Sequence, residues 1–320
     1  MNSWQCRPVP FKFQLGDWTL FEVPIQLQVR DVQLTDESPP VGVPEFPPDA
    51  LMAGSQGYVI RSLPVATAQS AIRRMDSYLC YVPLQYQRCY IDLGMSFDDY
   101  QKKFSSKTRS TIRRKVKKYA EHCGGSIPWR SFTTRSEMRE FFALARTVSR
   151  KTYQERLLDA GIPESEAFLA QAETLAAEHR VRAYILFFGE KPVSYLYCPV
   201  RDGVVIYAYL GYDPDYMHLS VGTVLQWLAI EPLFEEAGLR YFDFTEGQSD
   251  HKRLFATHQR RCANVFLAKR TIRNTMIIYS HFAMARFSEW LGALLETFGV
   301  KARVRRLLRF GRGEKQESLR

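Results

Sequence analysis

One stretch, residues 211–255, is the most informative part of the chain: GYDPDYMHLSVGTVLQWLAIEPLFEEAGLRYFDFTEGQSDHKRLF. A predicted strand ends at Tyr212, and after a turn residues 220–223 open a predicted helix. The first amides of a helix lack intrahelical partners, and the helix dipole favours negative charge there. Acid–base side chains follow the next predicted strand, residues 240–244. The stretch therefore predicts an enzyme whose phosphate-bearing cosubstrate lies next to its chemistry.

Composition describes a globular protein with two concentrations of positive charge. The 320 residues are 46% hydrophobic and 24% charged, which is typical of folded chains and allows two domains. Residues 101–118 hold nine lysines and arginines and no acid, and residues 301–320 hold eight basic residues and two acids. Such patches indicate anionic partners, namely phosphates, nucleic acid or membrane lipid, with a solvated helix face as the alternative.

The cysteine pattern and the lack of long apolar runs predict a cytoplasmic protein. Six cysteines are scattered without CxxC spacing, so we expect neither a redox motif nor a bound metal. Scattered thiols suit a reducing compartment. The first residues do not read as a secretory signal, and no run reaches the roughly 18 apolar residues of a membrane span.

Residue patterns predict a strand-rich first part and a mixed second part. Strands are expected at 11–15, 19–23, 58–63, 79–84 and 89–93, with a proline-rich loop at 38–48. Helices are expected at 96–122, 136–153 and 164–179. A meander (181–188, 193–200, 204–212), a helix (220–237), a strand (240–244), a short helix (250–257) and a strand (262–269) should follow. Pro232 should kink the 220–237 helix or end it early.

Two segments resemble motifs of a known enzyme family. Residues 96–125, SFDDYQKKFSSKTRSTIRRKVKKYAEHCGG, and residues 211–255 are similar to the GNAT acyltransferase superfamily. They resemble most closely its CelD-like branch of cellulose- and exopolysaccharide-biosynthesis acetyltransferases, over about residues 90–270. Ser-Val-Gly at 220–222 stands where that branch has Ser-Pro-Gly, and His-Lys at 251–252 where it has Tyr-Lys. The branch also resembles Fem-type transferases, which use aminoacyl-tRNA and contain two GNAT-like units.

The resemblance implies an α+β, mixed α/β fold of GNAT type, with two GNAT-related units built on mixed central sheets. Residues 1–125 would form an N-terminal GNAT-like unit that includes the basic helix. Residues 126–272 would form the acyl-CoA-binding unit. Residues 273–320 would add an amphipathic helix and a basic tail, which either contacts anionic membrane or packs against the body of the protein.

The resemblance further implies transfer of an acyl group from acyl-CoA, either acetyl-CoA or a longer thioester, to an amine or hydroxyl. The acceptor would be a sugar or sugar nucleotide in bacterial polysaccharide assembly. In this superfamily the CoA pyrophosphate rests on loop amides, and the pantetheine arm adds to a splayed sheet edge, here strand 204–212. An ordinary helix cap is the alternative for the loop. The expected CoA-binding residues are Tyr212, Ser220, Val221, Gly222, Thr223 and Lys252.

Direct acyl transfer needs a base for the incoming nucleophile. Glu246 and Asp243 lie at the predicted strand end where a base is expected, and His251 is the nearby residue that titrates near neutrality. Structural roles are the alternatives: Asp243 could pair with Lys252, and Glu246 could cap the next helix. Glu246, Asp243 and His251 are therefore the candidate catalytic residues.

Arg109 and Arg113 lie one helical turn apart in the basic segment. Arginine binds phosphate in bidentate fashion, so we expect this pair to hold an anionic small-molecule acceptor such as a sugar nucleotide. Nucleic acid is the other partner that this segment suits, and tRNA would fit a Fem-type, aminoacyl-tRNA-dependent transferase. A third alternative is a catalytically inactive GNAT-like protein with a regulatory or scaffold role. Binding of free CoA would distinguish the acyl-CoA-dependent enzyme from the aminoacyl-tRNA-dependent one. Catalytic turnover would distinguish both enzymes from the inactive protein.

Overall fold

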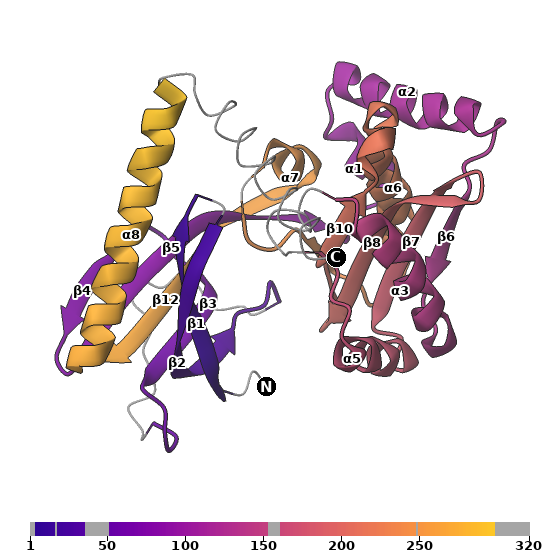
Figure 1. Cartoon of the computed structure of the whole chain (residues 1–320). Coiled ribbons are helices and arrows are strands. Elements are labelled where there is room, and N and C mark those ends of the chain that lie inside the picture. Colours follow the sequence, from indigo (N-terminus) through magenta and orange to yellow (C-terminus); the bar gives the residue numbers. More distant parts are fainter. Residues whose placement is uncertain (1–3, 17, 36–50, 153–160, 248, 298–320) are drawn as a thin grey trace, which may run out of the picture.

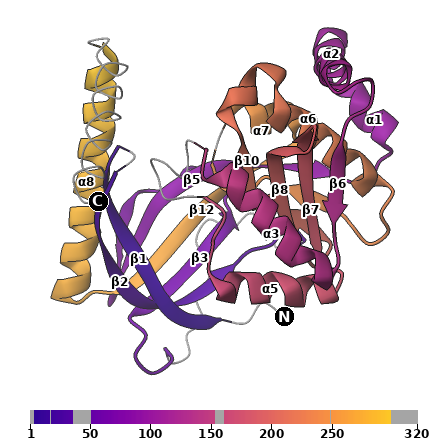
Figure 2. The same ribbon diagram turned by 45° about the vertical axis from the view of Figure 1, so that its right-hand side comes forward.

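The strands of this protein form one mixed sheet that runs through the whole molecule (Figures 1 and 2). The structure is a computed structural model that describes residues 4–16, 18–35, 51–152, 161–247 and 249–297. The strand order is β1-β2-β3-β12-β5-β11-β9-β8-β7-β6, with β4 paired to β5 and β10 paired to β8. The mixed α/β class expected from the sequence is confirmed. The proline-rich loop and the basic tail lie outside the described residues.

The N-terminal half is a curved sheet covered by one long helix. Its strands are β1 (Gln5–Leu15), β2 (Trp18–Asp31), β3 (Gly57–Pro64), β4 (Ile72–Met75), β5 (Tyr78–Asp92) and β12 (His258–Lys269). Alternate side chains of β1 and β2, such as Phe11 and Leu27, pack against Ile278 of α8 (Ile272–Thr297). The strands expected at 79–84 and 89–93 are one strand, β5, because residues 85–88 continue the pairing with β12.

β12 lies in the N-terminal half although it comes late in the sequence. It pairs antiparallel with both β3 and β5. The division expected at residue 125 stays a prediction, and two elements pack across it. β12 completes the first half of the sheet, and α2 (Ser106–His122) packs in the second half, where its Ile112 and Tyr119 join the core of α6 (Val221–Ile230).

The C-terminal half is a sheet with helices on both faces (Figure 1). Its strands are β6 (Trp129–Phe132), β7 (Val181–Phe188), β8 (Lys191–Arg201), β9 (Val204–Ile206), β10 (Tyr209–Tyr212) and β11 (Tyr241–Asp243). Side chains alternate along β7, so Ala183 packs with α3 (Arg135–Ser149) and α5 (Glu166–Ala177), whereas Tyr184 packs with α2 and α6. The apolar periodicity of these segments therefore specifies a two-faced core.

Helix boundaries follow local capping residues. The helix expected over 96–122 is two helices, α1 (Phe97–Lys102) and α2, because the Ser105 hydroxyl accepts the Thr108 amide at 3.2 Å and begins α2 anew. The helix from residue 220 ends at Ile230, and Pro232 lies in the 3-10 helix η2 (Glu231–Phe234), as its missing amide predicts. Ser249 caps α7 (Asp250–Phe255), so Glu246 is not the cap of that helix.

Candidate active site

The candidate site lies where β10 separates from β11. The sequence predicts one strand over 204–212, but the structure has two. Val205 of β9 pairs with Val200, and Tyr209 of β10 pairs with Tyr197, so one extra residue lies between the two strands. β11 pairs in parallel with β9 over the whole of β9, and it does not pair with β10. Within the described residues, β10 pairs only with β8.

The open edge of β10 offers backbone hydrogen-bonding groups. Asp213 donates its amide to the Val193 carbonyl at 2.8 Å, and the Ser194 hydroxyl donates to the Gly211 carbonyl at 2.9 Å. Backbone groups alternate between the two edges of an antiparallel strand. The amides and carbonyls of Leu210 and Tyr212 therefore point away from β8, toward the gap between β10 and β11.

The start of α6 presents unpaired amides to the same gap. Ser220 precedes the helix in the left-handed conformation, with φ of 55°, and its side chain makes no capping hydrogen bond. Its carbonyl accepts the Val224 amide at 3.0 Å, the first bond of the helix. The amides of Val221, Gly222 and Thr223 have no acceptor among the described residues. An anion placed there would receive hydrogen bonds and the favourable end of the helix dipole.

A pocket of about 300 Å³ joins these features. It contains every predicted CoA-binding residue except Lys252, and it also contains His251 of α7. The structure therefore brings the predicted loop, the strand edge and one candidate base to a single cavity. The lining residues are Tyr207, Leu210, Tyr212, Met217, Ser220, Val221, Gly222, Thr223 and His251.

Gly222 gives the pocket its depth between α6 and β10. A Cβ atom at this position would lie 3.5 Å from Cδ1 of Tyr212 and 3.7 Å from Cδ2 of Leu210. These are ordinary contact distances, so a small side chain would not strain the folded protein. It would instead occupy the space between the free amides and the strand edge. Glycine at this position therefore favours ligand access more than folding.

The helix start of α3 provides a contrast. A shallow recess of about 580 Å³ lies beside it, lined by Thr134, Arg135, Ser136, Arg139 and Glu173. Here a carboxylate of the chain already occupies the helix start, because Glu137 accepts the amides of Thr133 and Thr134, which precede α3, at 3.0 and 2.9 Å. No predicted site residue lies in this recess, and an anion would have to compete with Glu137.

His251 is held by a buried glutamine in the wall of the pocket. Its Nε2 lies 2.6 Å from Oε1 of Gln226, which is fully buried on α6. Burial lowers the pKa of His251 below its usual 6.5, and the charges of Lys115 and Lys252 lower it further. The imidazole is therefore neutral at pH 7. With Nε2–H donating to the Gln226 carbonyl, Nδ1 carries the lone pair that a base requires.

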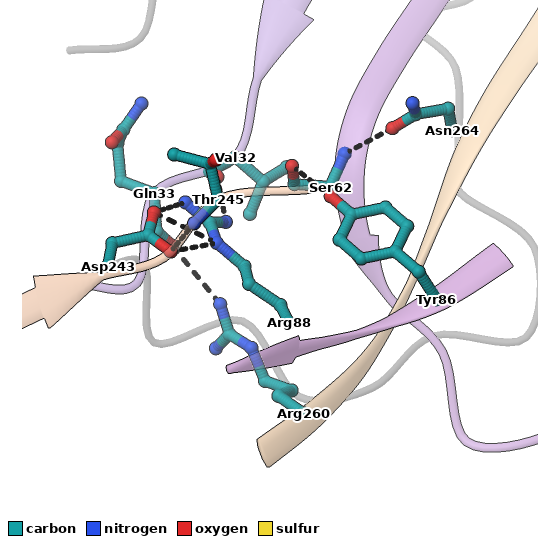
Figure 3. Close-up of polar contacts among 9 residues, drawn as sticks. All are labelled: Val32, Gln33, Ser62, Tyr86, Arg88, Asp243, Thr245, Arg260 and Asn264. Atoms are coloured by element: carbon teal, nitrogen blue, oxygen red, sulfur yellow. Dashed lines mark hydrogen bonds and ion pairs between the residues drawn. The ribbon is translucent and has the colours of Figure 1, made fainter. Parts of the chain in front are cut away.

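Asp243 is bound by Arg88 rather than by Lys252. Its carboxylate is 1% exposed and accepts from Nη2 of Arg88 at 2.5 Å and from Nε at 3.1 Å (Figure 3). The Thr245 amide donates to the same carboxylate at 2.9 Å, and Arg88 also donates to the Val32 carbonyl at 2.8 Å. Asp243 does not line the pocket. Its hydrogen bonds favour a structural role, in which it ties β11 to the end of β2.

Glu246 points away from the pocket toward the N-terminal half of the sheet. It is exposed, and its Oε1 accepts the Asn264 side-chain amide at 2.9 Å. Asn264 also accepts the Ser62 amide, and the Ser62 hydroxyl lies 2.7 Å from the Tyr86 hydroxyl (Figure 3). Lys252 donates to the Glu246 backbone carbonyl at 2.5 Å. Of these two candidate bases, the structure places His251 in the pocket wall and Glu246 outside it.

Arg109 and Arg113 lie on α2, which packs against α6 and the 3-10 helix η1 (Pro214–Leu219). Arg113 is exposed and donates to Gln101 at 3.1 Å, and Arg109 is half-buried. Neither lines the pocket. The basic segment is therefore on the helical layer that carries the pocket, and its binding of an acceptor stays a prediction.

Two residues of this region do not figure in the sequence prediction. Gln226 is the lone amide side chain in the segment VGTVLQWLAI, which is apolar apart from it and Thr223, and this is a signal that the sequence does offer. Arg88 lies in the middle of a strand, and its partner is 155 residues away, so local patterns cannot connect them.

The match to a family model agrees with the fold. Residues 106–253 match the family described as Acetyltransferase (GNAT) domain. No curated protein sequence matches the chain. Solved structures similar to this chain include the C-terminal domain (DUF2156) of a putative lysylphosphatidylglycerol synthetase from Agrobacterium fabrum, with 12% identity and a TM-score of 0.46 over 71% of each chain. L-PGS from Bacillus licheniformis has 16% identity and a TM-score of 0.42, over 70% of this chain and 71% of that one. FemX has 9% identity and a TM-score of 0.45, over 67% and 72%.

The fold is GNAT-like, and residues 106–253 match the GNAT acetyltransferase domain. The narrower CelD-like assignment stays a prediction. The described residues contain no group of three or more histidine, cysteine or acidic side chains able to hold a metal ion. None of the helices in the described ranges is both long and apolar enough to cross a membrane.

Proposed function

We propose that the protein transfers an acyl group from acyl-CoA to an amine or hydroxyl acceptor. The observation that carries this proposal is the pocket in which free amides of α6, the open edge of β10 and His251 meet. The amides of Val221 to Thr223 suit a pyrophosphate. The outward backbone groups of Leu210 and Tyr212 suit an extended amide-bearing arm, which would add to the sheet as a further strand.

Acyl transfer forms one bond at the thioester carbonyl carbon and breaks another, and it requires the acceptor to lose a proton. The acceptor nitrogen or oxygen bonds to the thioester carbonyl carbon, the carbon–sulfur bond breaks, and the thiolate leaves. His251 lines the pocket and is neutral, so its Nδ1 is the base proposed to accept the acceptor's proton. This proton can then pass to the departing thiolate. We assign the base to His251 rather than to Asp243 or Glu246, because neither carboxylate lines the pocket.

The acceptor proposed for this reaction is anionic. The α2 segment packs against η1 and α6, and its lysines and arginines, with no acid until Glu121, form a positive face on the same layer of helices. A sugar nucleotide of polysaccharide biosynthesis would supply the diphosphate that Arg109 and Arg113 suit. The same positive face also favours a second candidate, transfer from aminoacyl-tRNA, because a polyanion would gain from many such charges.

Calorimetry with acetyl-CoA, a longer acyl-CoA and an aminoacyl-tRNA tests both candidates. We expect saturable binding of acyl-CoA, competed by free CoA, and release of free thiol when a sugar-nucleotide amine is added. Binding of aminoacyl-tRNA but no acyl-CoA would replace the first candidate with the second. Binding of acyl-CoA without turnover on any tested acceptor class would favour an inactive GNAT-like protein.

A further inference from the structure

β11 ends beside the pocket, at the point where regular strand pairing would otherwise continue. The Asp243 carbonyl accepts the Tyr207 amide at 2.9 Å, and Tyr207 lines the pocket. The next residue, Phe244, still donates its amide to the Cys89 carbonyl of β5 at 3.1 Å. An extended chain beyond Phe244 would run beside β10 and pair with its outward backbone groups. The place where β11 ends therefore determines whether the edge of β10 stays open.

Thr245 ends the strand by turning the backbone into the left-handed region. Its φ is 60°, and among the described residues it is the only β-branched one with a positive φ. This conformation is strained for threonine, which favours extended backbone, whereas glycine takes it freely. A strained residue persists only where its surroundings hold it, and such residues gather at functional sites. The contacts that hold Thr245 therefore bear on the neighbouring pocket.

A buried ion pair holds this turn (Figure 3). The Thr245 amide donates to Oδ1 of Asp243 at 2.9 Å, an Asx-turn that uses the amide an extended chain would direct toward β10. Asp243 is oriented by Arg88, whose Nη2 lies 2.5 Å from Oδ2, and Arg88 also donates to the Val32 carbonyl at 2.8 Å. Both charged side chains are buried. The backbone at the end of β11 is thus set by a contact that reaches the end of β2.

The residue after the turn is also held away from β10. The Glu246 side chain contacts Asn264 of β12 at 2.9 Å, and the Glu246 carbonyl accepts Nζ of Lys252 on α7 at 2.5 Å. These contacts direct the chain toward β12 and α7. They leave the outward backbone groups of Leu210 and Tyr212 without a partner among the described strands.

We propose that Arg88 and Asp243 are positioning residues that keep the edge of β10 open for the extended arm of acyl-CoA. Neither side chain touches the arm. Together they hold Thr245 in its left-handed conformation, so β11 ends before it can pair with β10, and the arm takes the place of a protein strand. The identity of the arm rests on the proposed function, whereas the open edge of β10 does not.

Two double variants of the full chain test this role. Arg88→Met with Asp243→Leu removes both buried charges and the acceptor of the Thr245 amide, whereas Arg88→Met with Asp243→Asn removes the charges and keeps an acceptor oxygen. Calorimetry should show acetyl-CoA binding about tenfold weaker in the leucine variant and within about threefold of the wild type in the asparagine variant. Adding Thr245→Gly to the leucine variant should restore most of the affinity, because glycine takes the left-handed conformation unaided. Equal affinities for the two double variants would mean that the pair serves stability alone, and would overturn the proposal.

Hydrogen exchange of the ligand-free protein gives a second readout, followed in peptides that cover residues 209–212. The outward amides of Leu210 and Tyr212 should exchange fast in the wild type and in the asparagine variant. They should exchange about tenfold or more slowly in the leucine variant, because residues 245–247 would then pair with β10. Equally fast exchange in the leucine variant would overturn the proposal. A wild type that bound no acyl-CoA would refute the proposed function alone, and the exchange rates would still decide whether the pair holds β10 open.

Single changes at Thr245 repeat the comparison with the buried pair intact, and they replace the double variants if thermal unfolding shows the leucine variant to be unfolded. Thr245→Val favours extended backbone and should slow exchange of the β10 amides, whereas Thr245→Gly should leave it fast. Identical exchange in these two variants would contradict a role for the left-handed turn.

Discussion

Nε2 of His251 lies 2.6 Å from Oε1 of Gln226, and this contact joins α7 to α6 at the wall of the pocket. Gln226 is fully buried, and its amide nitrogen has no partner among the described residues. Leaving a buried donor unpaired is costly. What the buried glutamine provides is its carbonyl oxygen, which orients the imidazole and, by accepting from Nε2–H, sets its tautomer.

Gln226→Glu should move the acid limb of the pH–rate profile to higher pH. Burial and neighbouring lysines hold the pKa of His251 below 6.5, so the wild-type base is lost only as pH falls below that value. A carboxylate beside Nε2 favours the protonated ring and raises this pKa by about one unit or more. The measurement is kcat/KM against pH, with Gln226→Met as the variant without added charge. Superimposable profiles would show that His251 does not titrate in the rate-limiting step.

Replacing His251 should affect turnover far more than replacing Glu246. His251→Gln keeps a hydrogen-bonding side chain next to Gln226 but removes the base, so kcat should fall by about 10²–10⁴-fold. Glu246→Gln keeps the contact with Asn264 and should leave kcat within about threefold, because Glu246 does not line the pocket. Steady-state kinetics and acetyl-CoA binding, measured on both variants, separate chemistry from affinity. A larger loss of kcat in Glu246→Gln than in His251→Gln would instead assign the base to Glu246, at the end of β11.

Gly222→Val should weaken acyl-CoA binding by about tenfold or more. The added side chain would enter the space between the α6 amides and the side chains of Leu210 and Tyr212. Gly292→Val is the matched control, because Gly292 is also helical and a Cβ there meets nothing within 4 Å. Calorimetry gives both affinities, and thermal unfolding checks both folds. Equal affinities for the two variants would remove the phosphate site from the start of α6.

The paired arginines of α2 should act on the acceptor. Arg109→Ala with Arg113→Ala is expected to raise KM for an anionic acceptor and to make it less sensitive to salt, with acetyl-CoA binding intact. The control is Lys117→Ala, which removes one exposed charge, 3.9 Å from Glu121, on the same helix. Loss of CoA binding in the double variant would assign this segment to the donor instead.

The buried pair of Arg88 and Asp243 should matter for stability. Arg88→Met leaves the Asp243 carboxylate buried without its partner, so unfolding in urea should show a loss of about 3–5 kcal/mol. Removing both charges, with Arg88→Met and Asp243→Leu, should cost less than the single change. The control is Arg7→Met, which breaks the exposed 3.7 Å pair with Asp31 and should cost under about 1 kcal/mol. A double variant less stable than Arg88→Met would contradict this account.

Local signals explain which parts of this fold could be predicted. Three features are set by residues close together in the sequence, and all three are present in the structure. They are the meander, the loop at Ser220 that follows it, and the end of α6 before Pro232. The strands of the N-terminal half are longer than their turn residues indicate, because β5 continues through residues 85–88 on the strength of its pairing with β12. The position of β12 and the partner of Asp243 depend on contacts between distant segments, which no local pattern reports.

The insertion of β12 between β3 and β5 has a consequence for synthesis of the chain. Until residues 258–269 leave the ribosome, the facing edges of β3 and β5 have no strand to pair with. The first half therefore cannot be completed before the second half has been made, although its first strand begins at Gln5. An interrupted or truncated chain would expose two adjacent strand edges, the form in which nascent chains aggregate or recruit chaperones.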